Sequence, residues 1–153
     1  LQQYLDNTRH IVAKCGARAL VTSAKIKRLL GTVQEACPEL SQVVAVEAIR
    51  ESLEPLRPEV ITLDDTAFLQ FTSGSTSRPK GVSLTHANLA ANIKCIMEDG
   101  LAANPEDVGV SWLPLYHDMG LIGFVLAPLY HRVPIVYLSP LTFLKRPVTW
   151  FQA

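Results

Sequence analysis

Residues 71–81 carry a dense set of groups that could hold phosphate. The segment reads Phe-Thr-Ser-Gly-Ser-Thr-Ser-Arg-Pro-Lys-Gly. Its hydroxyl and backbone N–H groups can donate hydrogen bonds to phosphate oxygens, its glycines permit close backbone approach, and Arg78 and Lys80 add positive charge. A Ser/Thr/Gly cluster is more often an ordinary surface turn, and composition alone leaves that alternative open. The complete string is rarer than its composition and predicts a nucleotide-handling loop.

The residue order within this segment excludes two common site motifs. A Walker A loop requires Gly-Lys-Ser/Thr after four intervening residues, whereas Gly74 is followed at that distance by Pro-Lys-Gly. Neither Ser75 nor Ser77 stands in the Gly-x-Ser-x-Gly frame of a hydrolase nucleophile. The flanking sequence predicts a buried strand over 66–71 and a helix over 85–99, a strand–loop–helix order at which α/β sheets bind ligands.

The string closely resembles the phosphate-binding signature of the adenylate-forming enzymes, the superfamily of acyl-CoA synthetases, adenylation domains and luciferases. Their pattern is T-S-G-S/T-T-G-x-P-K-G. The chain departs from it at Ser77, where the superfamily usually has glycine and the fatty acyl-AMP ligase branch commonly does not. Residues 111–123, centred on Tyr-His-Asp-Met-Gly, resemble that branch's next motif, and residues 138–150 are also similar to it. The resemblance covers roughly residues 66–153, and the first half of the chain adds no further motif.

The resemblance implies roles for residues of both motifs. Lys80 is expected to act near pyrophosphate, and His117 beside the acyl carboxylate and the α-phosphate, both as catalytic residues. His117 taken alone would more often be a structural histidine, and Arg78 is as readily a solvated loop arginine. Asp118 either orients the His117 ring or caps the following helix. Phosphate binding is expected from Thr72, Ser73, Gly74, Ser75, Thr76, Lys80 and Gly81.

The implied chemistry is activation of a fatty acid by ATP to acyl-adenylate and pyrophosphate. The acyl group would then pass to an acyl carrier protein or a polyketide synthase carrier domain. The cofactors are ATP and Mg²⁺; the magnesium ligand is expected downstream of residue 153, so no metal ligand is assigned in this chain. Two alternatives stay open: an ordinary acyl-CoA synthetase, and a non-catalytic adenylation-like module that binds lipid or nucleotide. An unrelated ATP-binding protein is a more distant one.

The length of 153 residues is about that of one average domain. Because the resembled enzymes are several-fold longer, we expect residues 1–153 to be a fragment of the large N-terminal AMP-binding domain, without the small C-terminal domain. The full-length parent would be the ligase, and the isolated piece is predicted to be inactive.

Composition excludes several other classes of protein. Lys plus Arg equal Asp plus Glu at 14 each, so no net field would attract nucleic acid. The longest apolar run, over 119–130, is too short to span a bilayer, and the N-terminal residues lack a signal-peptide layout. We therefore expect a cytoplasmic protein. Cys15, Cys37 and Cys95 are widely spaced among apolar residues and are predicted to be buried free thiols.

Periodicity predicts the α/β class, with a mostly parallel sheet flanked by helices. Ser23 and Thr85 look like helix N-caps, Gly16 can end the first helix, and residues 47–65 show no firm period. Expected helices cover 1–15, 24–37, 85–99, 119–131 and 146–153, and expected strands cover 19–22, 43–46, 66–71, 108–113 and 134–138.

Overall fold

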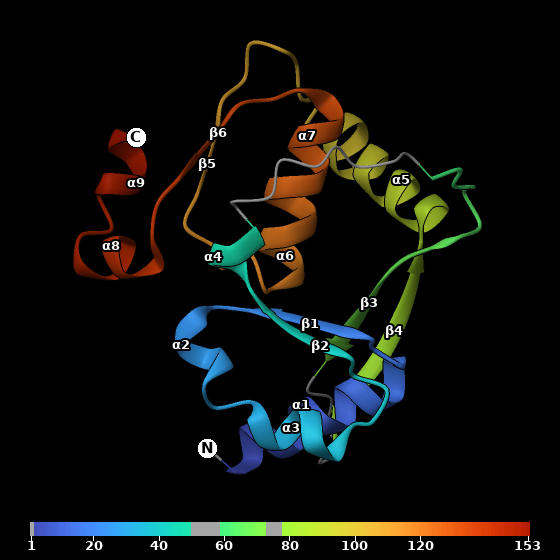
Figure 1. Cartoon of the computed structure of the whole chain (residues 1–153). Helices are drawn as coiled ribbons and strands as arrows, with labels where there is room; N and C mark the ends of the chain where they lie inside the picture. The colour runs from blue at the N-terminus through green and yellow to red at the C-terminus, as the bar shows by residue number, and fades with distance from the viewer. Residues whose placement is uncertain (1, 50–58, 73–77) are drawn as a thin grey trace. The chain divides into compact units, whose positions relative to one another are not determined.

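The computed structural model describes residues 2–49, 59–72 and 78–153 (Figure 1). The chain forms two compact units, one with residues 1–61 and 67–83 and the other with residues 62–66 and 84–153. Helices and strands alternate along both units, so the predicted α/β class is confirmed. None of the helices in the described ranges is long and apolar enough to cross a bilayer.

The first unit begins with the long helix α1 (Gln2–Cys15), which ends as predicted at Gly16. Gly16 adopts φ +60°, a left-handed conformation in which a side chain would be strained. Strand β1 (Ala19–Thr22) pairs in parallel with β2 (Gln42–Ala45), and Leu20 lies opposite Val43. The strand predicted over 43–46 is thus shifted by one residue.

The prediction of one helix over 24–37, between β1 and β2, was wrong. Two short helices occur instead, α2 (Ala24–Lys27) and α3 (Gly31–Ala36). Ser23 caps α2, as predicted, by accepting a hydrogen bond from the Ile26 N–H. The Leu30 N–H donates to the Lys27 carbonyl, three residues back, at 3.1 Å, so the last turn of α2 is tighter than an α-helical turn. The next residue, Gly31, is a weak helix former. A further short helix, α4 (Val46–Ile49), occupies part of the segment that was predicted to be irregular.

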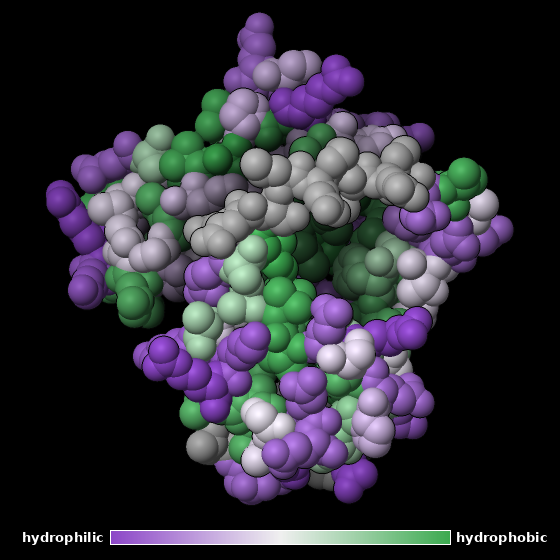
Figure 2. Space-filling view, in the orientation of Figure 1, coloured by the Kyte–Doolittle hydropathy of each residue, from purple (hydrophilic) through white to green (hydrophobic). Residues whose placement is uncertain are grey.

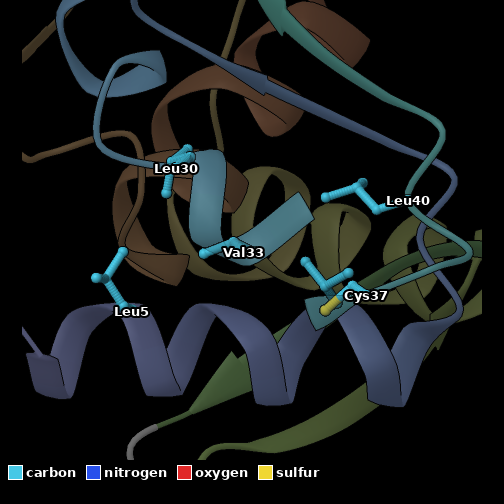
Figure 3. Close-up of a cluster of buried hydrophobic side chains, with 6 residues drawn as sticks. Leu5, Leu30, Val33, Cys37 and Leu40 are labelled. Carbon is cyan, nitrogen blue, oxygen red and sulfur yellow. The ribbon is translucent and has the colours of Figure 1, made fainter. Parts of the chain in front are cut away.

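The core of the first unit lies between α1 and α3 (Figure 3). Val33 of α3 and the neighbouring Leu30 are 0% and 2% exposed. Full burial of one such side chain stabilises the fold by about 1.5–3 kcal/mol. The sequence predicts that Leu1, Leu5, Thr8, Ile11 and Val12 share one face of α1; Leu5 and Val12 are in this core, and Leu1 lies outside the described residues. The buried members are Leu5, Val12, Leu30, Val33, Cys37 and Leu40.

The three cysteines are free, but only Cys37 is buried. Cys15 and Cys95 are exposed, so the prediction of three buried thiols was wrong for these two. Successive residues of a helix point to different sides, so apolar neighbours in sequence do not fix the burial of a side chain.

The phosphate-loop candidate lies between two paired strands, β3 (Thr66–Thr72) and β4 (Lys80–Thr85). The seven residues between them are too few for a parallel crossover, so the pair is a hairpin. The predicted strand–loop–helix order was therefore wrong: the order is strand–loop–strand. Strand β3 was expected to be buried, yet its residues are exposed or half-buried in the structure.

The second unit opens with the cap predicted at Thr85. The Thr85 hydroxyl accepts from the Asn88 N–H at 3.2 Å, and the Asn88 side chain accepts from the Thr85 N–H at 3.0 Å. This reciprocal capping box starts α5 (His86–Lys94), which continues as a π-helical segment over Cys95–Gly100. The sequence predicts that Leu89, Ile93, Ile96 and Met97 point inward, and the structure confirms it: Ile93 and Met97 are buried, and the other two pack against them.

The rest of the second unit is a parallel strand pair joined through a helical column (orange in Figure 1). Strand β5 (Gly109–Ser111) pairs with β6 (Ile135–Tyr137). The column comprises α6 (Asp118–Leu121), a π-helical segment over Ile122–Leu126, and α7 (Ala127–His131), close to the predicted 119–131.

Two short helices end the described chain, α8 (Pro140–Lys145) and α9 (Thr149–Gln152). The helix predicted over 146–153 is found only in the shorter α9, and α8 was not predicted. In the described ranges the strands form three two-stranded sheets, two of them parallel, in place of the expected single sheet.

Asp65, just before β3, gives a pH-dependent prediction. Its carboxylate accepts from the Thr62 N–H at 2.6 Å and from the Thr62 hydroxyl at 3.1 Å. These bonds, with a smaller effect from nearby His86, lower the pKa of Asp65 below its ordinary value of 3.8. Stabilisation by the charged carboxylate should be complete above that value and lost as pH falls through the lowered pKa.

We therefore expect Asp65→Asn to be less stable than the wild type at pH 7, with the difference shrinking below about pH 4. Urea unfolding of both proteins across this pH range measures it. A difference that stays constant down to pH 2 would contradict the assignment.

Candidate active site

The hairpin places the described residues of the phosphate-loop candidate at the ends of two strands. Thr72 is the last residue of β3, and Lys80 and Gly81 are the first two of β4. Ser73, Gly74, Ser75 and Thr76 lie outside the described residues. Their assignment to phosphate binding stays a prediction, as does that of Thr72.

Gly81 has a packing role in addition to the predicted one. A Cβ atom at this position would lie 3.1 Å from the Cζ atom of Phe71 on the paired strand. Such a contact is tighter than nine in ten real ones, so a side chain here would require the Phe71 ring to shift by a few tenths of an ångström. Glycine at the start of β4 therefore suits the close packing of the Phe71 ring.

An open hollow of about 660 Å³ lies beside this end of the hairpin, within the first unit. Lys14 of α1 and Arg78 and Lys80 of the hairpin bring positive charge to its lining, and Leu69 and Phe71 supply an apolar wall. Three cationic side chains around one concave surface raise the local concentration of anions. The lining therefore suits a phosphorylated ligand.

His117 begins the helical column of the second unit. It is the N-cap of α6, and its Nδ1 atom lies 3.2 Å from the Met119 nitrogen. The carboxylate of Asp118 lies 2.7 Å from both His117 Nδ1 and the Met119 nitrogen. The Met119 N–H therefore donates both to His117 Nδ1 and to the Asp118 carboxylate. Asp118 thus contacts both the His117 ring and the first turn of the helix, whose N-cap is His117; an orienting role for Asp118 stays a prediction.

Gly120 fixes the turn that carries His117. The His117 N–H donates to the Pro114 carbonyl at 3.1 Å, and the Leu121 N–H donates to the His117 carbonyl at 2.9 Å. Gly120 is buried, and a Cβ atom there would collide with the backbone carbonyl of Pro114. Only glycine allows the helix to begin this close to the preceding backbone. The string from Pro114 to Gly120 is therefore one local structural unit.

The described residues offer no arrangement for a metal ion. No group of three or more His, Cys, Asp or Glu side chains in these ranges is placed to hold one.

One residue that contacts the phosphate-loop hairpin was missed by sequence reasoning. His10 of α1 lies with its Nε2 atom 3.0 Å from the carbonyl oxygen of Pro79. The two residues are 69 positions apart, and no local pattern around either one signals the contact.

The AMP-binding enzyme family matches residues 2–153, almost the whole chain. The chain belongs to this family. It is 39% identical over 140 residues to 4-hydroxyphenylalkanoate adenylyltransferase of Mycobacterium tuberculosis, covering 87% of this chain and 23% of that protein. It is also 47% identical over 87 residues to the medium-chain-fatty-acid–[acyl-carrier-protein] ligase TtuA of Teredinibacter turnerae, covering 57% of this chain and 13% of the ligase.

Solved structures of AMP-binding enzymes confirm the fold and the resemblance to the fatty acyl-AMP ligases. A structure from a study of fatty acyl-adenylate ligases of E. coli and L. pneumophila matches with a TM-score of 0.85 and 33% identity, over 98% of this chain and 27% of that one. The fatty acyl-adenylate ligase of L. pneumophila in complex with acyl adenylate and pyrophosphate matches with a TM-score of 0.77 and 34% identity, over 97% of this chain and 25% of that one. The chain therefore spans about a quarter or less of the length of these relatives.

Proposed function

We propose that this chain is a segment of the large N-terminal domain of a fatty acyl-AMP ligase. The whole ligase is called the full-length protein below. That protein activates a fatty acid with ATP to acyl-adenylate and pyrophosphate. The observation that carries the proposal is the hairpin that brings Arg78, Lys80 and Gly81 to one cationic hollow. One structural relative is described in complex with acyl adenylate and pyrophosphate, the two products of this reaction.

The exposed apolar surface supports the view that the chain packs against further protein. Leu141 and Leu144 of α8 and Phe151 of α9 are more than half exposed. Figure 2 shows hydrophobic side chains (green) reaching the surface among polar ones on the face drawn. Large apolar side chains at a surface commonly mark a site of contact with other protein.

The proposed reaction forms a bond between a carboxylate oxygen of the fatty acid and the α-phosphorus of ATP. The bond from that phosphorus to the bridging oxygen breaks, and pyrophosphate leaves with the added negative charge. Lys80 and the loop donors stabilise this charge as it develops, which lowers the barrier without tightening acid binding. His117, with its ring held by Asp118, orients the carboxylate. Mg²⁺, whose ligand is expected downstream of residue 153, would neutralise charge at the phosphates when bound.

Direct detection of the acyl-adenylate tests this function. The full-length protein is incubated with ATP, MgCl₂ and a labelled medium-chain fatty acid, and the products are separated by chromatography. We expect label in acyl-AMP, with an equal amount of pyrophosphate. Fatty acid binding without any acyl-AMP would contradict the proposal and favour a non-catalytic binding module.

The thiol that accepts the acyl group gives a second prediction. Residues 138–150 resemble the fatty acyl-AMP ligases, and in the structure this segment packs on β5. Phe143 stacks on Trp112 with ring centroids 4.1 Å apart, and the Trp150 indole N–H donates to the Val110 carbonyl at 2.9 Å. Together with Ser77, this segment favours a carrier-protein thiol, the acceptor named for the relative TtuA.

We expect the full-length protein to transfer its acyl group to a holo acyl carrier protein in preference to free coenzyme A. A competition between the two thiols at equal concentration measures the preference, and the apo carrier protein, which has no thiol, is the control. Faster formation of acyl-CoA would instead identify an ordinary acyl-CoA synthetase. The cytoplasmic location expected from composition remains a prediction.

A further inference from the structure

His10 makes a hydrogen bond that connects α1 to the phosphate-loop hairpin. Its Nε2 atom lies 3.0 Å from the carbonyl oxygen of Pro79, and the ring is half-buried. A carbonyl oxygen can only accept a hydrogen bond, so Nε2 must carry the proton and donate it. The bond therefore fixes the protonation of this ring nitrogen.

The acceptor is well placed to control Lys80. The Pro79 carbonyl belongs to the planar peptide group that also contains the nitrogen and the Cα atom of Lys80, so fixing its direction also fixes the direction of the Lys80 N–Cα bond. The proline ring restricts rotation on the other side of the same residue. Lys80 is the first residue of β4, where one end of the strand has no preceding ladder residue to hold it.

His10, the donor, belongs to helix α1, which is held in place by the core of the first unit. Helix α1 has 14 residues, and Leu5 and Val12, on either side of His10, are buried in the core of the first unit. Lys14, one turn beyond His10, lines the same hollow as Arg78 and Lys80. Three like charges around one hollow repel each other, and a fixed backbone limits how far Lys80 can move away from its neighbours.

We propose that His10 is a positioning residue, which holds the Pro79 carbonyl and thereby places the Lys80 ammonium group for adenylate formation. This inference rests on the proposed function. His10 does not contact the reacting atoms, and it acts through Lys80.

Substitutions of His10 separate the hydrogen bond from the imidazole itself. The side-chain nitrogen of glutamine reaches about as far as Nε2 of histidine, whereas that of asparagine stops about one bond short. His10→Ala and His10→Asn should lower kcat for acyl-adenylate formation about five- to tenfold, the effect of losing one hydrogen bond. His10→Gln should remain within about twofold of the wild type, and KM for the fatty acid should stay unchanged in all three variants.

A double-mutant cycle with Lys80→Ala tests whether His10 acts through Lys80. In the Lys80→Ala background, His10→Ala should have almost no further effect on kcat, since the group that it positions has been removed. Multiplicative losses in the double mutant would overturn the inference. So would a loss in His10→Gln equal to the loss in His10→Ala, because it would show that a donor at the position of Nε2 does not preserve the rate.

Pyrophosphate binding to the full-length protein, measured by calorimetry, distinguishes failure of this inference from failure of the proposed function. We expect the affinity to fall five- to tenfold in His10→Ala and to be preserved in His10→Gln, with unchanged thermal unfolding of the latter. A wild type that forms no acyl-adenylate yet shows this pattern refutes the proposed function alone. Equal pyrophosphate affinity in wild type and His10→Ala refutes the positioning role.

Discussion

Replacing Lys80 with alanine should slow acyl-adenylate formation by the full-length protein by about 100-fold or more. Removal of one preorganised group that stabilises developing charge commonly costs this much, about 3 kcal/mol in the transition state. The fatty acid carries no phosphate, so its affinity should change less than threefold. Single-turnover rates with saturating ATP, alongside fatty acid binding by calorimetry, measure the two effects separately.

Two further variants serve as controls for this prediction. Lys27→Ala removes a lysine of the same unit from the exposed helix α2, and it should leave the rate unchanged. Lys80→Arg keeps the charge on a different side chain and should recover part of the rate. A Lys80→Ala enzyme with the wild-type rate would show that residues 72–81 form only a surface turn.

Gly120→Ala should destabilise the protein and impair activity, whereas Gly123→Ala should do neither. A methyl group at position 120 would collide with the Pro114 carbonyl, which cannot swing away as a flexible side chain could. Overpacking of this kind costs about 1–3 kcal/mol, and it would also displace the turn that carries His117. A methyl group at position 123 meets nothing within 4 Å and should stabilise the helix by up to about 1 kcal/mol.

Denaturant unfolding of the two glycine variants and the wild type checks this contrast. The same samples should show a raised KM for the fatty acid in Gly120→Ala only, because His117 is expected to lie beside the carboxylate. Equal unfolding midpoints for the two variants would refute the role given to Gly120.

Local signals in the sequence were enough to place most helices of the fold. Ser23 and Thr85 cap helices as predicted, because a side-chain oxygen before an apolar helical face satisfies N–H groups only two or three residues away. Gly16 ends α1 for an equally local reason, its left-handed backbone. The helix over 119–131 was predicted from its apolar run, and in the structure it begins one residue earlier, at Asp118.

Strand β4 was missed because its sequence, Lys-Gly-Val-Ser-Leu-Thr, begins with a lysine and a glycine, which are weak strand formers. Pairing with β3, and the Phe71 ring that lies over Gly81, stabilise it in place of intrinsic propensity. The break between α2 and α3 was missed for a related reason. Apolar residues such as Ile26, Leu30 and Val33 recur at helical spacing on both sides of the break, so the sequence resembles one helix. The packing of Leu30 and Val33 against α1 decides where the chain turns.

For the candidate site, the sequence identified residues that can do chemistry but not the ones that position them. Lys80 and His117 stand out because their motifs are local. His10 and Gly120 act through backbone carbonyls, Pro79 and Pro114, and the first of these contacts joins segments 69 residues apart. Contacts between distant segments depend on the fold, so a single sequence does not reveal them.

Exchange of labelled pyrophosphate into ATP by the full-length protein tests the central claim most directly, because it reports formation and reversal of the acyl-adenylate. We expect exchange that requires both ATP and a medium- or long-chain fatty acid and that Lys80→Ala reduces about 100-fold. Absence of fatty-acid-dependent exchange in a protein that binds the acid normally would contradict the claim that this chain is part of a fatty acyl-AMP ligase.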